Sequence, residues 1–388
     1  MRKFIKWVIR AVVLLAIILG GLAIWKREDI NRLLAVNSLF SEEKIVNNFS
    51  HMDELFLNER LTLSGAPASP LPANPLEMPD MSAWLKERAV TGLVVLKDGQ
   101  LVHESYYLGT ADTDLRISWS VAKSFLSALM GVVLEEGDIA SIDDQVTQYA
   151  PSLKGSAYEG ATIRNVLNMA SGVHFNEDYL DFNSDINKMG RVLALGGSMD
   201  EFAASITGRD RAPGEAWQYV SIDTHVLGMV IRGATGRSIK ELMVEKLLTP
   251  LGLEADPYYL TDGYGVAFVL GGLNLRTRDY ARLGQLFLQN GMWNGVPLVP
   301  EAWVQASTVN SAPNTPDDVG YGFQWWLPAD GNEGEYFARG IYGQYIYINP
   351  AKGVVIAANA ADRGFTEDGA NLQNIAMFRE IAAKVSAE

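Results

Sequence analysis

The spacing of apolar residues predicts strands near both ends of the main body and helices between them. Asp98-Gly99 separates two short apolar runs, an arrangement typical of a β-hairpin, and a last helix is predicted from about Asn371. The predicted strands are 93–96, 101–107, 344–350 and 354–358. Apolar residues recur at helical spacing in six segments between the strand pairs. These segments are 120–137, 163–169, 198–206, 224–233, 238–248 and 278–290.

This order of elements predicts an α+β fold of the α/β sandwich type. One antiparallel sheet is assembled from both ends of the body and covered by terminal helices, and a helical region is inserted at about 138–330. We expect the catalytic body to span residues 81–388, with its active site at the junction of the sheet and the helical region.

The N-terminus has a different pattern, because a charge-free apolar run from Ala11 to Trp25 lies between two basic clusters. The clusters are Arg2, Lys3, Lys6 and Arg10 before the run, and Lys26 and Arg27 after it. No small-residue cleavage site follows the run, so residues 1–27 are predicted to be a signal anchor. Trp7-Val8-Ile9 extends the run to about the 20 residues that a bilayer needs if Arg10 snorkels. A cleaved secretory signal is the alternative.

Beyond the anchor, residues 28–80 carry mixed charge and then several prolines, which predicts a stiff, extended linker. The predicted protein is therefore a single-pass protein of a bacterial inner membrane, with its catalytic domain on the periplasmic side. The oligomeric state does not follow from the sequence.

The chain has 388 residues, 48% of them hydrophobic, so it is long enough for a substantial core. Its net charge of −14 argues against nucleic acid as a partner. It contains no cysteine, which excludes a lipoprotein anchor, disulfides and thiol chemistry.

Ser120-Val121-Ala122-Lys123 carries the candidate chemistry at the start of an apolar helix. Residues three apart share a helix face, so the Ser120 hydroxyl and the Lys123 amine are expected close together. Lysine is a base only if burial or nearby positive charge lowers its pKa. The Ser-x-x-Lys pattern is weak alone, and a second instance at 41–44, in a polar stretch, is interpreted as solvated.

Tyr219 follows the turn at Pro213-Gly214 and precedes another apolar helix. A phenol near Ser120 and Lys123 would complete a proton relay from the serine to the leaving group. The alternative is a tyrosine packed into the junction of the two regions with its hydroxyl bonded to backbone.

Three ordered blocks resemble the β-lactamase-related serine hydrolases: residues 120–123, the Pro-Gly-x4-Tyr219-x-Ser221 block and residues 339–344. That group includes class C β-lactamases, DD-peptidases, carboxylesterases with this fold and hydrolases of 6-aminohexanoate oligomers. The resemblance runs from about Gly92 to Val385. It implies a β-lactamase/DD-peptidase-like fold in which Ser120 is acylated, Lys123 and Tyr219 transfer protons, and the backbone N–H groups of Ser120 and Gln344 form the oxyanion hole.

The chain departs from the penicillin-recognising members at two places. Ile341-Tyr342-Gly343 stands where those members carry Lys-Thr-Gly, and Ser221 where they often carry Asn. The acidic loop 171–185 looks most like the 6-aminohexanoate-oligomer hydrolases, and within it Tyr179 and Asp181 are the candidate substrate contacts. An equally plausible interpretation is a solvated acidic loop. The remaining candidate substrate-binding residues are Ser221, Trp325, Trp326, Ile341, Tyr342 and Gly343.

These observations predict a serine hydrolase acting on a small ester or amide through an acyl-enzyme, without cofactor or metal. A β-lactamase or DD-peptidase is one alternative, and a catalytically silent wall-binding or sensor protein of the same fold is another. A histidine-dependent hydrolase is less favoured, since no G-x-S-x-G elbow accompanies His51, His103, His174 and His225. A metal hydrolase would need an H-E-x-x-H motif or a cluster of ligands, and the sequence has neither.

Overall fold

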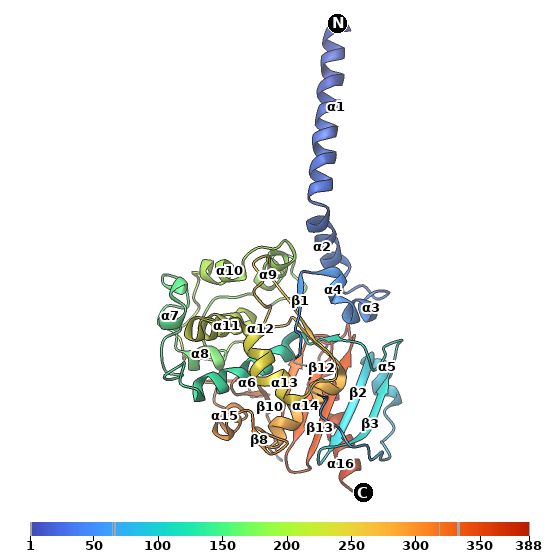
Figure 1. Cartoon of the computed structure of the whole chain (residues 1–388), viewed down its shortest axis with the longest axis vertical. Coiled ribbons are helices and arrows are strands. Elements are labelled where there is room, and N and C mark those ends of the chain that lie inside the picture. The colour runs from blue at the N-terminus through green and yellow to red at the C-terminus, as the bar shows by residue number, and fades with distance from the viewer. Residues whose placement is uncertain (1, 64, 66, 318, 332–333, 388) are drawn as a thin grey trace.

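The structure is a computed structural model that describes residues 2–63, 65, 67–317, 319–331 and 334–387. Helix α1 (Arg2–Trp25) projects away from a compact body (Figure 1). Residues Arg2–Gly21 are long and apolar enough to cross a membrane, with a mean hydropathy of 2.1, and no part of that window is buried against the body. This finding rests on length and composition alone, and a signal sequence would pass the same test.

A sheet of seven antiparallel strands forms one side of the described body. In spatial order its strands are β3 (Gln100–Tyr106), β2 (Val90–Lys97), β13 (Val354–Ala360), β12 (Gln344–Asn349), β11 (Tyr336–Gly340), β10 (Trp326–Pro328) and β9 (Val319–Tyr321). The N-terminal hairpin β2–β3 pairs directly with the C-terminal strand β13. The predicted assembly of one sheet from both ends of the body is therefore confirmed.

Alternation along β2 decides what covers each face of the sheet. Leu93 and Val95 pack into a core cluster with α5 (Ser82–Glu87) and α16 (Ala370–Ser386), whereas Val94 and Leu96 join the larger cluster on the other face. Each such buried side chain contributes about 1.5–3 kcal/mol of transfer free energy. Both faces of the sheet are thus buried against apolar side chains, as the near-continuous apolar character of β2 requires.

The middle of the chain is mainly helical, as the helical spacing predicted. Its helices are α6 (Ala122–Glu135), α7 (Val146–Tyr149), α8 (Ile163–Leu167), α9 (Asp185–Ala194), α10 (Met199–Ser205), α11 (Ser221–Thr235), α12 (Ile239–Met243), α13 (Thr249–Leu251), α14 (Thr277–Leu288) and α15 (Glu301–Ser307). A π-helical stretch (Val244–Leu248) joins α12 to α13, and a two-stranded hairpin of β7 (Met292–Trp293) and β8 (Val296–Pro297) follows α14. The expected insertion at 138–330 ends earlier in the structure, at α15, because β9 and β10 belong to the main sheet.

The predicted linker at 28–80 is wrong for its first half. Residues 27–60 form α2 (Arg27–Ser38), α3 (Ile45–Ser50), α4 (Met52–Leu55) and β1 (Asn58–Arg60). Phe49 and Met52 are buried in the main core, and β1 pairs with β5 (Tyr258–Leu260). Through β6 (Leu273–Leu275) this small sheet reaches β4 (Arg116–Ile117), which leads into the candidate site. The apolar residues of 28–61 occur in short clusters among charged residues, yet several of them are buried in the main core.

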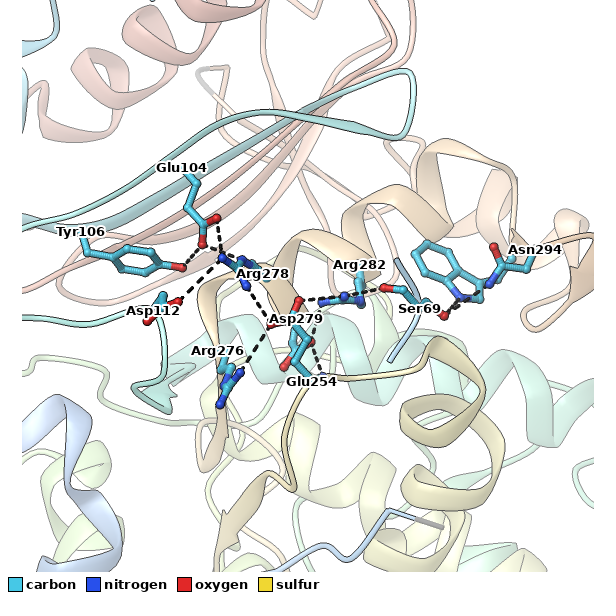
Figure 2. A network of polar contacts seen from close by, with 11 residues as sticks. Ser69, Glu104, Tyr106, Asp112, Glu254, Arg276, Arg278, Asp279, Arg282 and Asn294 are labelled. Atoms are coloured by element: carbon cyan, nitrogen blue, oxygen red, sulfur yellow. Dashed lines mark hydrogen bonds and ion pairs between the residues drawn. The ribbon is translucent and has the colours of Figure 1, made fainter. Parts of the chain in front are cut away.

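A buried ionic network fixes the proline-rich stretch to the body (Figure 2). Arg282 on α14 is almost fully buried and donates hydrogen bonds to the Ser69 carbonyl oxygen (2.7 Å), to Asp279 (2.8 Å) and to Glu254 (3.0 Å). Arg278, on the same helix, pairs through its Nε with Glu104 of β3 at 2.6 Å. α14 therefore links the proline-rich segment, the sheet and the loop before β5.

Candidate active site

Ser120 lies in a tight connection between β4 and α6. The connection is a single 3₁₀ turn, Trp119–Val121, in which Trp119 adopts a positive φ of 40°. Gly340, the last residue of β11, closes on this turn: a Cβ there would lie 2.7 Å from the Ser118 oxygen and 3.1 Å from the Ser120 nitrogen. Ser120 is consequently held at the junction of the main sheet and the helical region, as the sequence predicted.

Lys123 is close to Ser120, one turn along the helix. Its Nζ donates to Ser120 Oγ at 3.1 Å and to the Leu270 carbonyl oxygen at 2.8 Å, and only 2% of the residue is exposed. Burial lowers the pKa of Lys123 from 10.5 to about 7, although the negative charges of Glu177 and Asp223 oppose that shift. A large share of Lys123 is therefore neutral near pH 7 and can accept a proton.

Tyr219 completes the group on the stretch just before α11. Its ring centroid lies 5.5 Å from Lys123 Nζ, and the ring stacks on Trp326 at 5.3 Å. Burial raises the pKa of Tyr219, while a hydrogen bond with Ser120 and the charge of Arg339 act in the opposite direction. The hydroxyl is thus kept in its neutral form.

Glu177 is a site residue that the sequence interpretation missed. Its carboxylate accepts a short hydrogen bond from the Ser221 backbone N–H, a second from Ser221 Oγ (3.2 Å) and a third from the Tyr179 hydroxyl (3.1 Å). Burial raises the pKa of Glu177, and the Lys123 charge lowers it. Glu177 lies in the same acidic loop from which Tyr179 and Asp181 were selected, so the available signal was its position two residues before Tyr179.

Asp223 is a second buried carboxyl group near Lys123. It lies on α11 and accepts a hydrogen bond from the Tyr158 hydroxyl at 2.7 Å. Burial raises the pKa of Asp223 to about 8. The site therefore contains two carboxyl groups whose ionisation is coupled electrostatically to that of Lys123.

An apolar cavity of about 310 Å³ opens at Ser120. Four of the predicted substrate-binding residues line it: Tyr179, Ser221, Ile341 and Tyr342. Its other walls come mainly from three places in the chain: the segment from α2 to α4, the loop and helix at 180–193, and residues 260–271. The first of these is the segment that was expected to be a linker.

The remaining predicted residues lie elsewhere. Trp325 is fully buried against Phe287, with ring centroids 4.5 Å apart, and Asp181 accepts a hydrogen bond from the Asn183 backbone N–H (2.8 Å). Trp326 does not line the cavity, and its ring stacks on that of Tyr219. Gln344 stands opposite Gly340 in the β11–β12 ladder, where its buried amide donates to the Ala360 carbonyl oxygen (2.8 Å).

Gly343 lies in the turn between those strands, with a positive φ of 83°. Gly340, rather than Gly343, is the glycine that touches the Ser120 turn. Ile341 is the next residue, and its N–H donates no hydrogen bond to any residue that the structure describes. The same holds, within the described ranges, for the N–H of Ser120.

The histidines contact other partners. His225 pairs with Asp200 (2.7 Å) and His174 with Asp210 (2.8 Å). His103 bonds Ser105, and His51 lies against the Asn47 carbonyl oxygen, each at 2.8 Å. Within the described ranges, no group of three or more His, Cys, Asp and Glu side chains is arranged to hold a metal ion.

The sheet, the inserted helices and the placement of the site define a hydrolase of the serine β-lactamase fold. The chain belongs to the Beta-lactamase family, whose profile matches residues 81–376. Both the predicted resemblance and the predicted fold are thereby confirmed.

Two similar proteins are both named as 6-aminohexanoate-dimer hydrolases. The chain is 31% identical over 310 residues to the 6-aminohexanoate-dimer hydrolase of Paenarthrobacter ureafaciens, a match that covers 75% of this chain and 78% of that one. A solved structure from Bacillus anthracis, provisionally named a 6-aminohexanoate-dimer hydrolase, superposes with a TM-score of 0.81 at 23% identity, covering 90% of this chain and 96% of the other. EstCE1, a hydrolase with promiscuous acyltransferase activity, superposes with a TM-score of 0.58 at 15% identity over 78% of this chain and 96% of its own.

Proposed function

We propose that this protein is a serine hydrolase that cleaves esters or amides with an apolar acyl group through an acyl-enzyme at Ser120. The observation that carries the proposal is the buried Lys123 amine, which lies 3.1 Å from Ser120 Oγ and has a pKa lowered to about 7. A neutral amine at that distance is a general base for the hydroxyl.

In the acylation step, Lys123 takes the proton from Ser120 Oγ as that oxygen bonds to the substrate carbonyl carbon. The carbon–oxygen or carbon–nitrogen bond to the leaving group then breaks. Tyr219 donates its proton to the leaving group and regains one from Lys123 through the same polar cluster. In the second step, water attacks the acyl carbon and gives its proton to Tyr219 or Lys123. The bond between the acyl carbon and Ser120 Oγ then breaks, and the same proton passes to Oγ, which restores the free hydroxyl.

The developing oxyanion needs two N–H donors that have no other acceptor. The N–H groups of Ser120 and Ile341 meet that requirement among the described residues, and the close approach of Gly340 to the Ser120 turn brings their backbones together. The sequence interpretation had selected the Gln344 backbone N–H; Gln344 pairs with Gly340 in the β11–β12 ladder and does not line the cavity.

The apolar cavity and the relatives support the substrate class. The cavity walls are mainly aliphatic and aromatic, which suits an apolar acyl group. The relative of known name acts on the 6-aminohexanoate dimer, and its 31% identity to this chain supports amides as well as esters.

A β-lactam or D-alanyl peptide is the second candidate substrate, and one observation favours keeping it. Arg339 on β11 lies 5.6 Å over the Trp326 ring, which in turn stacks on Tyr219. A cation is therefore present near the site, although Ile341 supplies none, and a substrate carboxylate needs such a partner.

We also propose that α1 anchors the protein in the membrane with its body outside the cytoplasm. The charge-free apolar run from Ala11 to Trp25 in the N-terminal helix and the excess of basic residues before that run support this topology.

A substrate panel tests the function directly. The full chain in detergent should hydrolyse p-nitrophenyl butyrate and linear amide oligomers, and Ser120→Ala and Lys123→Ala should each lower kcat by about a thousandfold or more with unchanged thermal unfolding. Labelling by a fluorophosphonate should disappear in Ser120→Ala. Absence of labelling in the parent chain would favour the silent wall-binding or sensor protein, and faster turnover of nitrocefin than of the butyrate ester would favour the β-lactamase.

A further inference from the structure

Large apolar side chains are exposed around the cavity mouth, at the end of the body from which α1 projects. We call them the rim patch: Ile30 and Leu34 on α2, Leu180 and Phe182 in the loop before α9, and Leu195 just after it. Leu34 is 59% exposed, Leu180 87% and Leu195 49%. Figure 1 shows α2 and α9 together at this end. Exposed apolar clusters of this kind mark interaction surfaces.

The rim patch is continuous within itself and with the apolar N-terminal helix. Arg32 of α2 donates its Nε–H to the Ala194 carbonyl oxygen at 2.7 Å, which joins α2 to the end of α9. A single residue, Lys26, separates α1 from α2. Helix α2 has 12 residues and is therefore about 18 Å long, so Ile30 and Leu34 lie within that distance of the end of α1.

The cavity connects the rim patch to Ser120. Its walls include Val36 of α2, Phe40 just after that helix, and Leu180 and Phe182 of the rim patch itself. An acyl chain entering at the rim would thus meet apolar side chains along its path to the nucleophile.

One cation at the rim has no carboxylate partner. The Arg191 guanidinium lies 4.1 Å over the Phe182 ring and donates to the Phe182 carbonyl oxygen, and it forms no ion pair with any residue in the described ranges. An arginine on an apolar surface complements a phosphate headgroup.

We propose that the rim patch rests on the surface of the bilayer that α1 anchors, and that the substrate is a membrane-resident amphiphile whose long acyl chain is held by an ester or amide bond. This deepens the proposed function and rests on it. The acyl chain of such a substrate leaves the bilayer at the rim patch, while the carbonyl group of the substrate reaches Ser120.

The absence of native cysteine makes the orientation directly measurable. Leu195→Cys and, as a matched control, Val296→Cys are each labelled with an environment-sensitive dye in the full chain. Val296 is 54% exposed on β8, at the opposite end of the body in Figure 1. In vesicles of phosphatidylethanolamine and phosphatidylglycerol containing nitroxide lipids, quenching at 195 should exceed that at 296 by about threefold or more. Equal quenching at the two positions would overturn the docking surface.

A second experiment tests the substrate class with charges placed on the rim patch outside the cavity walls. The double variant Leu34→Glu/Leu195→Glu in the same vesicles should hydrolyse embedded p-nitrophenyl palmitate about tenfold more slowly, while p-nitrophenyl butyrate in solution stays within about twofold of the parent chain. Val296→Glu should change neither rate. Equal rates on palmitate for parent and double variant would overturn the inference. Strong quenching at 195 with neither ester cleaved would instead count against the hydrolase itself.

Discussion

At the scale of single residues, the site is controlled by the charge of Lys123. Desolvation favours its neutral form, whereas Glu177 and Asp223 favour the ammonium, and the balance leaves its pKa at about 7. Only the neutral amine accepts the Ser120 proton. The hydrolytic rate should therefore depend on pH near neutrality through Lys123 and the carboxyl groups coupled to it.

We expect kcat/KM for p-nitrophenyl butyrate to be low at pH 5.5, to rise through a midpoint at about pH 7 and to level off above pH 8. The direction follows from the role of Lys123: protonation removes the base, so activity is lost as pH falls through its pKa. A pH–rate profile of the full chain measures the midpoint. A limb near pH 10 would show that Lys123 is not the group that titrates.

Glu177→Gln should move that midpoint toward lower pH. The substitution removes a negative charge that stabilises the Lys123 ammonium, while the amide oxygen still accepts from the Ser221 N–H. Glu301→Gln, at the exposed start of α15, is the matched control and should leave the profile unchanged. An unshifted midpoint in Glu177→Gln would mean that its charge is not coupled to the base.

At the scale of elements, the site depends on the contact between the end of β11 and the Ser120 turn. Gly340 occupies a position where a Cβ would lie 2.7 Å from the Ser118 oxygen, closer than real Cβ atoms come to backbone. The strand end and the turn must therefore separate if a larger residue stands there.

We expect Gly340→Ala to lower kcat by about a hundredfold, because the separation moves the Ile341 N–H away from the position of the oxyanion. The fold should survive, with a loss of about 1–3 kcal/mol in the free energy of unfolding. Stopped-flow ester hydrolysis and urea unfolding measure the two effects. Near-normal kcat in this variant would argue against an oxyanion hole built from Ile341.

The ionic network on α14 should matter more for stability than any exposed ion pair. Arg282→Met leaves the buried Asp279 carboxyl group without its cation and the Ser69 carbonyl oxygen without its donor, at an expected cost of about 3–5 kcal/mol in the free energy of unfolding. Arg363→Met breaks an exposed pair with Glu42 and should cost less than about 1 kcal/mol. Urea denaturation of the two variants makes the comparison, and equal losses would contradict it.

Helices with a strong local period were predictable, and elements that depend on distant partners were not. α6, α11 and α14 show apolar residues at helical spacing over several turns, and α6 is followed by Gly137 with a positive φ of 86°, as its predicted end required. α2 carries four charged residues and has no buried one, and α3, α4 and β1 span only six, four and three residues. The pairing that orders β1 is with β5, some 200 positions away.

Within the site, the same limit separates the residues that were found from those that were missed. The Ser120–Lys123 contact follows from one helical turn. The choice between Glu177 and Asp181 depended on which side of the loop faces α11, and the choice between Ile341 and Gln344 depended on where β11 meets the Ser120 turn. A sequence pattern contains neither piece of information, because both are set by packing between elements far apart in the chain.

At the scale of the whole molecule, the helices and the strand found within 28–80 determine where the chain can be truncated without loss of the fold. Helix α1 makes no buried contact over its apolar window, whereas α2 to α4 and β1 fill the core and wall the cavity. The functional body therefore begins at about residue 27, inside the region that the sequence assigned to a linker.

A chain that begins at Arg27 should be recovered as a soluble protein and should hydrolyse p-nitrophenyl butyrate at nearly the rate of the full chain. A chain that begins at Met81 should aggregate or unfold, because it loses the buried side chains of Leu39, Phe49 and Met52 at about 1.5–3 kcal/mol each, more than half of a typical domain's net stability. Fractionation, circular dichroism and ester hydrolysis on both chains make the test. A folded, active protein starting at Met81 would show that residues 28–80 act as a linker after all and that α2 to α4 are not part of the site.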